Sequence, residues 1–432
     1  MPNNRRRKGK SDREARTNGS VQTSDDDSFN DNASVTSNIS EVRSTDDGND
    51  EMDEVNQQEA FEEKLSEAID GFTQKSAQGR CNCFELTSKA LVKKYMPGYI
   101  VDRRVTICDA VEKSLKRGRG AEQTAAARLA TLLCVQLGAL DECEEVCKML
   151  KPILLQTVND KSILPSTRSE CCIALSLMAF LAGGEMGDVL HLMQQFESIF
   201  AGSYLKGDGT VANVTAEIGL LHSAALSAWT LLCTLMTAGD INSMMGSGVN
   251  FSPSISQLSE MLQSPHLEVR MSAGEALATV FEIGSEFSEE FGDDYKPDLI
   301  EALHHLATDS HKYRAKKDRK QQRASFRDVL RYIENRTVPD VQIKFGQECL
   351  VLDTWARRKH YDALCNVLGS GFNLHLAKNE LLRDIFQLGQ KILISDISIN
   401  RQSKLERHLV NAAAFKARTI SRGKNRDKRS DF

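Results

Sequence analysis

The sequence has little proline, few aromatic residues and no long apolar run. It contains 8 prolines and 6% aromatic residues in 432 residues. We find no run of roughly 18 consecutive apolar residues to cross a membrane, and the first residues are too polar for a secretory signal. We therefore expect a cytoplasmic and nuclear protein without a membrane partner. In such a reducing compartment, its 11 cysteines should be free thiols packed as small apolar side chains.

Motifs for catalysis and cofactor binding are also missing. The sequence has no phosphate-binding loop, nucleophile elbow, H-E-x-x-H pair or dinucleotide-binding glycine motif. Cys143 and Cys147 fall on one face of a predicted helix and could supply two metal ligands, but a structural zinc site needs four. We expect no enzyme activity, no catalytic residue, no cofactor, no bound metal and no small-molecule substrate.

Charge is distributed unevenly along the chain, although the formal net charge is only −5. Residues 1–16 are basic, and residues 25–63 carry fourteen acidic side chains against Arg43 alone. Residues 1–57 have too few aliphatic side chains to form a core, so we predict a disordered tail. The basic run Arg5–Lys10 could be a nuclear import signal, or the tail could simply aid solubility.

From Glu59 onward the apolar residues recur with a helical period. A pattern of the form Val-Arg-x-x-Ala-x-x-Ala-Leu begins at Val269 and recurs, with substitutions, at Thr167 and Glu122. Its spacing favours armadillo or HEAT repeats of ~40–47 residues over unrelated buried helices. We predict an all-α protein with an armadillo/HEAT-like helical solenoid at residues 58–309. Such solenoids offer extended binding surfaces.

The C-terminal third has a different sequence pattern, with more charged residues and two short strand-like segments. A charged helix is predicted over residues 311–334, followed by two short strands around Gly346 and helices at 354–368 and 374–388, the second broken near Asn379. We predict a small, mostly helical C-terminal domain at residues 310–400 with a short β-hairpin. Residues 401–432 should form a basic terminal helix and tail.

Two basic segments are the candidate binding sites. Residues 311–331 carry nine basic and two acidic side chains, and residues 401–432 carry ten and three, so most i,i+4 acidic partners are missing. Such faces attract a polyanion, and structured RNA fits better than a membrane or a DNA sequence, although an ordinary solvated face is the simpler alternative. The terminal candidates are Lys404, Arg407, His408, Lys416, Arg418, Arg422, Lys424, Arg426, Lys428 and Arg429. The candidates of the second basic segment are Lys312, Arg314, Lys316, Lys317, Arg319, Lys320, Arg323 and Arg327.

Three segments carry a resemblance to a known family. They are HKYRAKKDRKQQRASFRDVLRYIE (311–334), KHYDALCNVLGSGFNLHLAKNELLRDIFQLG (359–389) and KLERHLVNAAAFKARTISRGKNRDKR (404–429). The chain resembles the interferon-related developmental regulator family over roughly residues 59–432, whereas its Asp/Ser-rich N-terminal tail departs from the family.

The resemblance implies an armadillo-like domain, a family-specific C-terminal domain, no enzymatic activity and a role in cell differentiation. It also implies two classes of partner. One is the idle ribosome and its rRNA, with the C-terminal helix entering the mRNA path and silencing translation. The alternative is a nuclear scaffold whose solenoid recruits histone deacetylase corepressor complexes.

Overall fold

The computed structural model describes residues 50–389, except residues 139, 184, 247–252 and 309–314. Apart from residues 50–52, the described residues belong to one compact unit. The predicted terminal basic segment, with all its candidate residues, lies outside the described residues, as do Lys312, Arg314 and most of the N-terminal tail.

The described residues are helical except for loops and one hairpin. The helices are α1 Asp50–Asp70, α2 Ala77–Lys93, α3 Pro97–Val101, α4 Arg104–Arg117, α5 Ala121–Leu137, α6 Glu142–Asn159, α7 Pro165–Ala182, α8 Met186–Phe200, α9 Ala216–Cys233, α10 Ala238–Gly246, α11 Ile255–Glu260, α12 Leu267–Phe287, α13 Lys296–Thr308, α14 Lys316–Asn335, α15 Trp355–Leu368, α16 Phe372–Lys378 and α17 Glu380–Ile385. The strands are β1 Val341–Phe345 and β2 Glu348–Leu352. Helix α1 thus begins within the stretch that the sequence assigns to the tail.

Local chemistry explains where many helices begin and end. Pro165 occupies the first turn of α7, where its missing N–H costs nothing, and Gly183 stops the same helix with φ 73°. The Thr354 side chain caps α15 by accepting from the Arg357 N–H at 3.0 Å. At these positions, proline, glycine and capping residues in the sequence mark where the helices begin and end.

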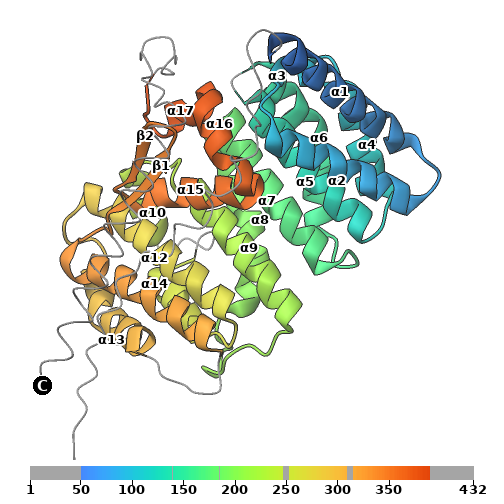
Figure 1. Cartoon of the computed structure of the whole chain (residues 1–432). Helices are drawn as coiled ribbons and strands as arrows, with labels where there is room; N and C mark the ends of the chain where they lie inside the picture. Colours follow the sequence, from blue (N-terminus) through green and yellow to red (C-terminus); the bar gives the residue numbers. More distant parts are fainter. Residues whose placement is uncertain (1–49, 139, 184, 247–252, 309–314, 390–432) are drawn as a thin grey trace, which may run out of the picture. The chain divides into compact units, whose positions relative to one another are not determined.

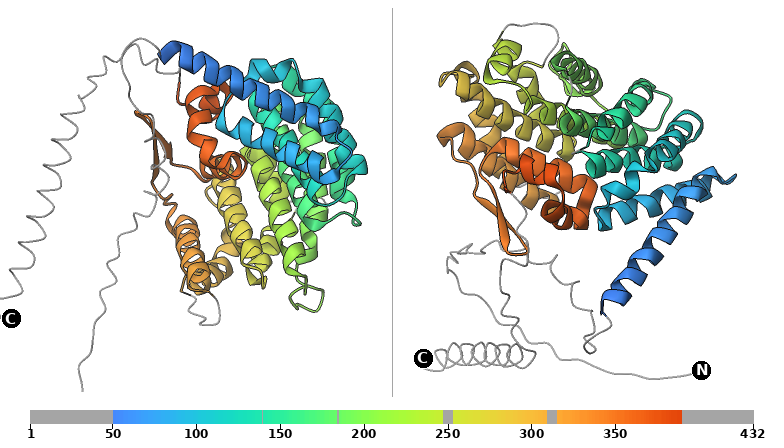
Figure 2. Two further views of the ribbon diagram at one scale, coloured as in Figure 1. Left: turned by 45° about the vertical axis from the view of Figure 1, so that its right-hand side comes forward. Right: turned by 90° about the horizontal axis from the view of Figure 1, so that it is seen from above.

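Six helices, α2, α5, α7, α9, α12 and α14, pack side by side in sequence order, and we call them the helix row. Helices α4, α6 and α8 form a second layer against α5, α7 and α9 (Figures 1 and 2). Helices α5, α7 and α9 of the row are apolar on most sides, as expected of helices that neighbours cover on several sides. The predicted all-α solenoid with a short hairpin is confirmed.

The repeat pattern marks members of this row. Its second position is occupied by Gln123, Arg168 and Arg270, and each side chain donates to a carbonyl at or near the end of the preceding helix segment, at Leu115, Val158 and Ser264 respectively. These bonds satisfy carbonyls that a helix terminus leaves without a partner. The sequence pattern therefore records a repeated way of joining one helix pair to the next.

A further copy, which the sequence analysis missed, lies in α9. His222 occupies the position of the arginine, with Ala225 and Ala228 at the small positions, and its Nδ1 is hydrogen-bonded to Ser203 Oγ at 2.7 Å. Burial lowers the pKa of His222 to about 4, so the ring is neutral. Substitution of arginine by histidine hid this copy.

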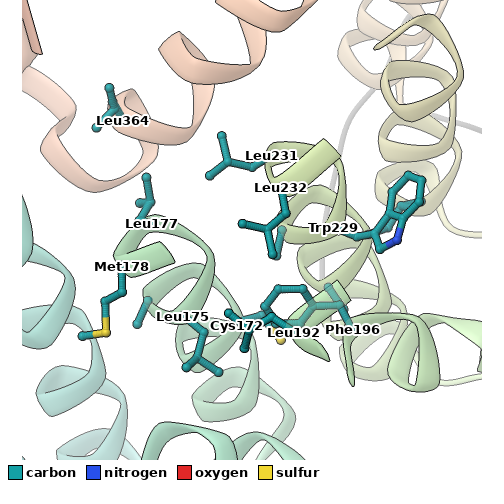
Figure 3. Close-up of a cluster of buried hydrophobic side chains, with 14 of the residues drawn as sticks. Cys172, Leu175, Leu177, Met178, Leu192, Phe196, Trp229, Leu231, Leu232 and Leu364 are labelled. Carbon is teal, nitrogen blue, oxygen red and sulfur yellow. The ribbon is translucent and has the colours of Figure 1, made fainter. Parts of the chain in front are cut away.

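By length and composition, α9 could span a membrane, with a mean hydropathy of 1.3. It lies instead between α7 and α12, where Trp229, Leu231 and Leu232 are almost fully buried (Figure 3). The apolar character of α9 therefore reflects its place in the middle of the helix row.

The C-terminal segment returns to the helix row. Strands β1 and β2 pair antiparallel, with Val341 opposite Leu352, around Gly346 at φ 57°. Helix α15 then packs on α5, α9 and α12 (Figure 1). Figure 3 shows Leu364 of α15 above Leu177 of α7 and Leu231 of α9. The core of the solenoid is therefore completed by the C-terminal helices.

Candidate nucleic-acid interface

The candidate interface is built on α14, which is amphipathic with a narrow apolar stripe. Phe326, Val329 and Ile333 are buried toward α12 and α13. The helix ends at Asn335, and the next residue, Arg336, has left-handed backbone geometry at φ 57°, shortly before Pro339. Since a helix has 3.6 residues per turn, this stripe fixes which side chains face outward.

A polar contact and an aromatic contact hold α14 against α12. The Arg270 guanidinium donates to the Gln322 side-chain carbonyl at 2.7 Å, and both side chains are buried. A Cβ placed on Gly274 would come within 2.8 Å of the Phe326 ring, so this close approach requires glycine. The orientation of α14 is therefore defined by packing.

The opposite side of α14 carries a group of cations that we call the basic face. Lys316, Lys317, Lys320 and Arg327 are exposed and Arg323 is half-buried. In the described part of the chain, no carboxylate lies within the 4.0 Å ion-pair distance of Lys316, Lys317, Arg323 or Arg327. These four like charges therefore lie along one helix side without an ion-pair partner among the described residues.

One acidic residue of α14, Asp328, pairs with another helix and not with the basic face. Asp328 pairs across to Arg358 of α15 at 3.7 Å, and burial raises its pKa. The Arg358 guanidinium also stacks on the Trp355 ring, 4.6 Å from its centroid. Asp328 therefore belongs to the contact between α14 and α15.

The described cations of the second basic segment do not all lie on the same side of α14. Lys316, Lys317, Lys320, Arg323 and Arg327 share the basic face. Arg319 is half-buried beside the apolar stripe, and its Nε is buried without a hydrogen-bond partner among the described residues. The structure therefore brings together five of the predicted cations and turns the sixth toward the packed side.

The sequence analysis predicted that the solenoid would provide an extended surface for binding partners. The C-terminal helices cover part of this surface on the helix row. Trp355 N–H and Ala356 N–H at the start of α15 both donate to the Glu282 carboxylate at 2.8 Å. Farther along, His375 donates to the Leu91 carbonyl at 2.9 Å and Asn379 to the Val135 carbonyl at 2.8 Å. This surface is occupied by the chain itself from α2 to α12.

Ionisable groups are buried beneath α15. The Lys359 ammonium donates to Ser227 Oγ at 2.6 Å and lies 3.4 Å from the Glu275 carboxylate. Burial raises the pKa of the neighbouring Asp362 to about 6. The cavity beside these residues is about 30 Å³, which holds about one water molecule and excludes a substrate. These groups serve packing between helices.

A larger hollow of about 720 Å³ opens where α4 and α6 end and α7 begins. Its charged lining residues are Lys116, Arg119 and Asp160, and the rest are amide, hydroxyl, glycine and aliphatic side chains. This lining contains no cysteine or histidine nucleophile or base.

Three cysteines form the one cluster among the described residues that could hold a metal ion. Cys143 and Cys147 were identified in the sequence as two possible ligands, and the structure adds Cys134 of the adjacent α5. Hydrogen bonds from Cys134 and Cys143 lower the pKa of the Cys147 thiol. The sequence analysis missed Cys134 because it lies on a different helix from Cys143 and Cys147. The i,i+4 spacing that relates residues on one helix face does not apply across the turn between the two helices.

Comparison with known proteins places these features in a family. Residues 32–334 match the family described as "Interferon-related developmental regulator (IFRD)", and residues 379–430 match the "Interferon-related protein conserved region". The chain is 38% identical over 387 residues to interferon-related developmental regulator 2 of Mus musculus, covering 89% of this chain and 86% of the relative.

The similarity extends to other relatives. Interferon-related developmental regulator 1 of Homo sapiens is also 38% identical over 387 residues, covering 89% of this chain and 84% of the relative. A protein of Schizosaccharomyces pombe is 26% identical over 294 residues, covering 61% of this chain and 62% of its own length. The first matched region ends within α14, and the second spans all the terminal candidate residues.

Proposed function

The chain belongs to the interferon-related developmental regulator family, and on that premise we propose that it is a non-enzymatic regulator of gene expression in differentiation. It binds idle ribosomes through its basic C-terminal segments and silences translation. The protein acts in the cytoplasm and also enters the nucleus. The observation that carries the proposal is the basic face of α14, whose cations project outward while Asp328 pairs with Arg358.

Ribosomal RNA is the polyanion that fits this surface. Its phosphates can contact a row of Lys and Arg side chains without base-specific readout. The terminal segment adds ten basic side chains against three acidic ones. In the proposed mechanism, the terminal helix enters the mRNA channel and the basic face of α14 makes a second contact on the rRNA.

The alternative function is a nuclear scaffold that recruits histone deacetylase corepressor complexes through the solenoid. Such a scaffold needs an open surface on the helix row or on the second layer. Helices α15, α16 and α17 cover the row from α2 to α12, so a corepressor subunit would have to displace them or bind the layer of α4, α6 and α8. This covering favours the ribosome as the main partner.

Sedimentation of the tagged full chain through sucrose gradients tests the proposal. The chain should travel with ribosomes that lack mRNA and not with polysomes. With roughly six phosphate contacts, affinity should fall by about three orders of magnitude between 50 and 200 mM salt. Deletion of residues 401–432 should remove most of this binding.

Two outcomes would overturn the ribosome proposal. One is a truncated chain that sediments with ribosomes as well as the full chain does, and the other is a full chain that travels with polysomes. Co-purification of a deacetylase with the truncated chain, together with nuclear retention, would then support the scaffold.

A further inference from the structure

Three thiols from two adjacent helices converge at one end of the α5–α6 pair. Cys134 lies on α5, and Cys143 and Cys147 lie one turn apart on α6. The three sulfur atoms all lie within 4.8 Å of one another, and the Sγ atoms of Cys134 and Cys147 are 3.8 Å apart. This arrangement has no part in the proposed ribosome contact.

The sulfur separations match those of thiolates around one metal ion. A metal–sulfur distance of ~2.3 Å places three sulfurs of a trigonal plane about 4.0 Å apart. The observed separations differ from this value by less than 1 Å. Rotation of the cysteine side chains within their helices would be enough to close the site.

The burial of the three thiols provides both enclosure and an entry path. Cys134 and Cys143 are 0% and 1% exposed, whereas Cys147 is half-buried and thus partly accessible to solvent. An ion could therefore reach the cluster past Cys147 and then be held away from water. A preformed cluster with an entry path is expected of a metal site.

The donor set identifies the class of ion. Thiolates prefer soft cations, and no histidine or carboxylate among the described residues joins the group. Structural zinc sites take four ligands, whereas three sulfurs can satisfy a monovalent copper ion. We propose that Cys134, Cys143 and Cys147 form a three-thiolate site for one Cu(I) ion, each thiol losing its proton to solvent when the ion binds.

The test is a competition titration of the full chain, kept reduced, between Cu(I) and the chromogenic chelator bicinchoninate. The full chain should retain one tightly held Cu(I), and X-ray absorption should show three sulfur neighbours. Cys147→Ser should weaken this affinity at least tenfold. Cys147 is the variant of choice because its half-buried side chain tolerates the change better than the two buried thiols.

Cys365→Ser is the matched control, because Cys365 is also half-buried but lies on α15, away from the cluster. It should leave the tightly held Cu(I) unchanged. Equal loss in the two variants, or no loss in Cys147→Ser, would overturn the site. Tighter retention of Zn(II) than of Cu(I) in a parallel titration would overturn the choice of ion.

Discussion

The basic face of α14 and the surface of the helix row beneath α15 differ in how their charged side chains are accommodated. Beneath α15, Lys359 contacts Ser227 and Glu275, and the Glu282 carboxylate accepts two backbone N–H groups. On α14, Lys316 and Arg327 project into solvent away from any described carboxylate.

The difference follows from the cost of burying charge. A buried ionic group without a partner costs several kcal/mol, so the contact beneath α15 forms only if each charge is satisfied. An exposed cation is hydrated, and a like-charge i,i+4 pair costs a helix only ~0.2–0.5 kcal/mol. The contact beneath α15 thus serves folding, while the basic face remains available for an external anion.

The largest expected change in stability is in the helix row. Ala276 of α12 is 0% exposed, and Ala276→Phe should lower the free energy of unfolding by about 3 kcal/mol, because the added ring overpacks a helix contact. Urea unfolding provides the measurement. Gln321→Phe, at an exposed position of α14, should change stability by less than about 0.5 kcal/mol. Similar losses in both variants would contradict the distinction between the two surfaces.

The next effect concerns the ion pair beneath α15. Lys359→Met should lower the free energy of unfolding by about 2–3 kcal/mol, because Glu275 loses its ion-pair partner and Asp362 a favourable nearby charge. This loss of stability is smaller than that expected for breaking a fully buried ion pair, because the Glu275 side chain is 35% exposed. Thermal melts should show this loss. Lys317→Met on the basic face is the control and should leave the melting temperature unchanged.

Acid should weaken the same contact through His360. Burial lowers the pKa of His360 to about 4, while the unfolded chain titrates near ~6.5. The unfolded state therefore binds more protons between these values, and stability falls as the pH drops from 6.5 to 4. His360→Gln should remove about 2 kcal/mol of this acid-induced loss. Urea unfolding at pH 7 and pH 4.5 measures this loss of stability. His304→Gln, at an exposed position, is the control and should leave the loss unchanged.

The smallest change in stability is expected on the basic face. Replacing Lys316, Arg323 and Arg327 with glutamine should leave the melting temperature unchanged or raise it slightly, because like charges are removed. Ribosome binding should nevertheless weaken, and the slope of log affinity against log salt should become less steep by about 3. An unchanged slope would remove α14 from the interface without affecting the terminal segment.

Local patterns made much of the fold predictable. The apolar period of residues such as Phe326 and Ile333 predicted α14, and Gly346 predicted the hairpin turn. Asn379 marked the break between α16 and α17 because its side chain caps α17, accepting from the Leu382 N–H at 3.4 Å. The role of each of these residues depends mainly on its near neighbours in the chain.

The repeat was only partly visible in the sequence. Arg168 and Arg270 carried the pattern, but His222 performs the corresponding role in α9 with a different side chain and a different partner. A motif search recognises residue types, whereas a helix terminus requires only a suitable polar partner. The packing of α9 between α7 and α12 was needed to reveal the missing copy.

By itself, the sequence determined the helical class, the hairpin, the cationic segments and the family, because periodicity, turn residues and charge are properties of nearby residues. The tertiary structure alone decided that α15 covers the helix row, that Asp328 faces Arg358 and that Cys134 meets Cys147. The bond from His375 to the Leu91 carbonyl joins residues far apart in the chain. Such contacts depend on which helix faces remain unpaired after the row has assembled, and no local pattern specifies that choice.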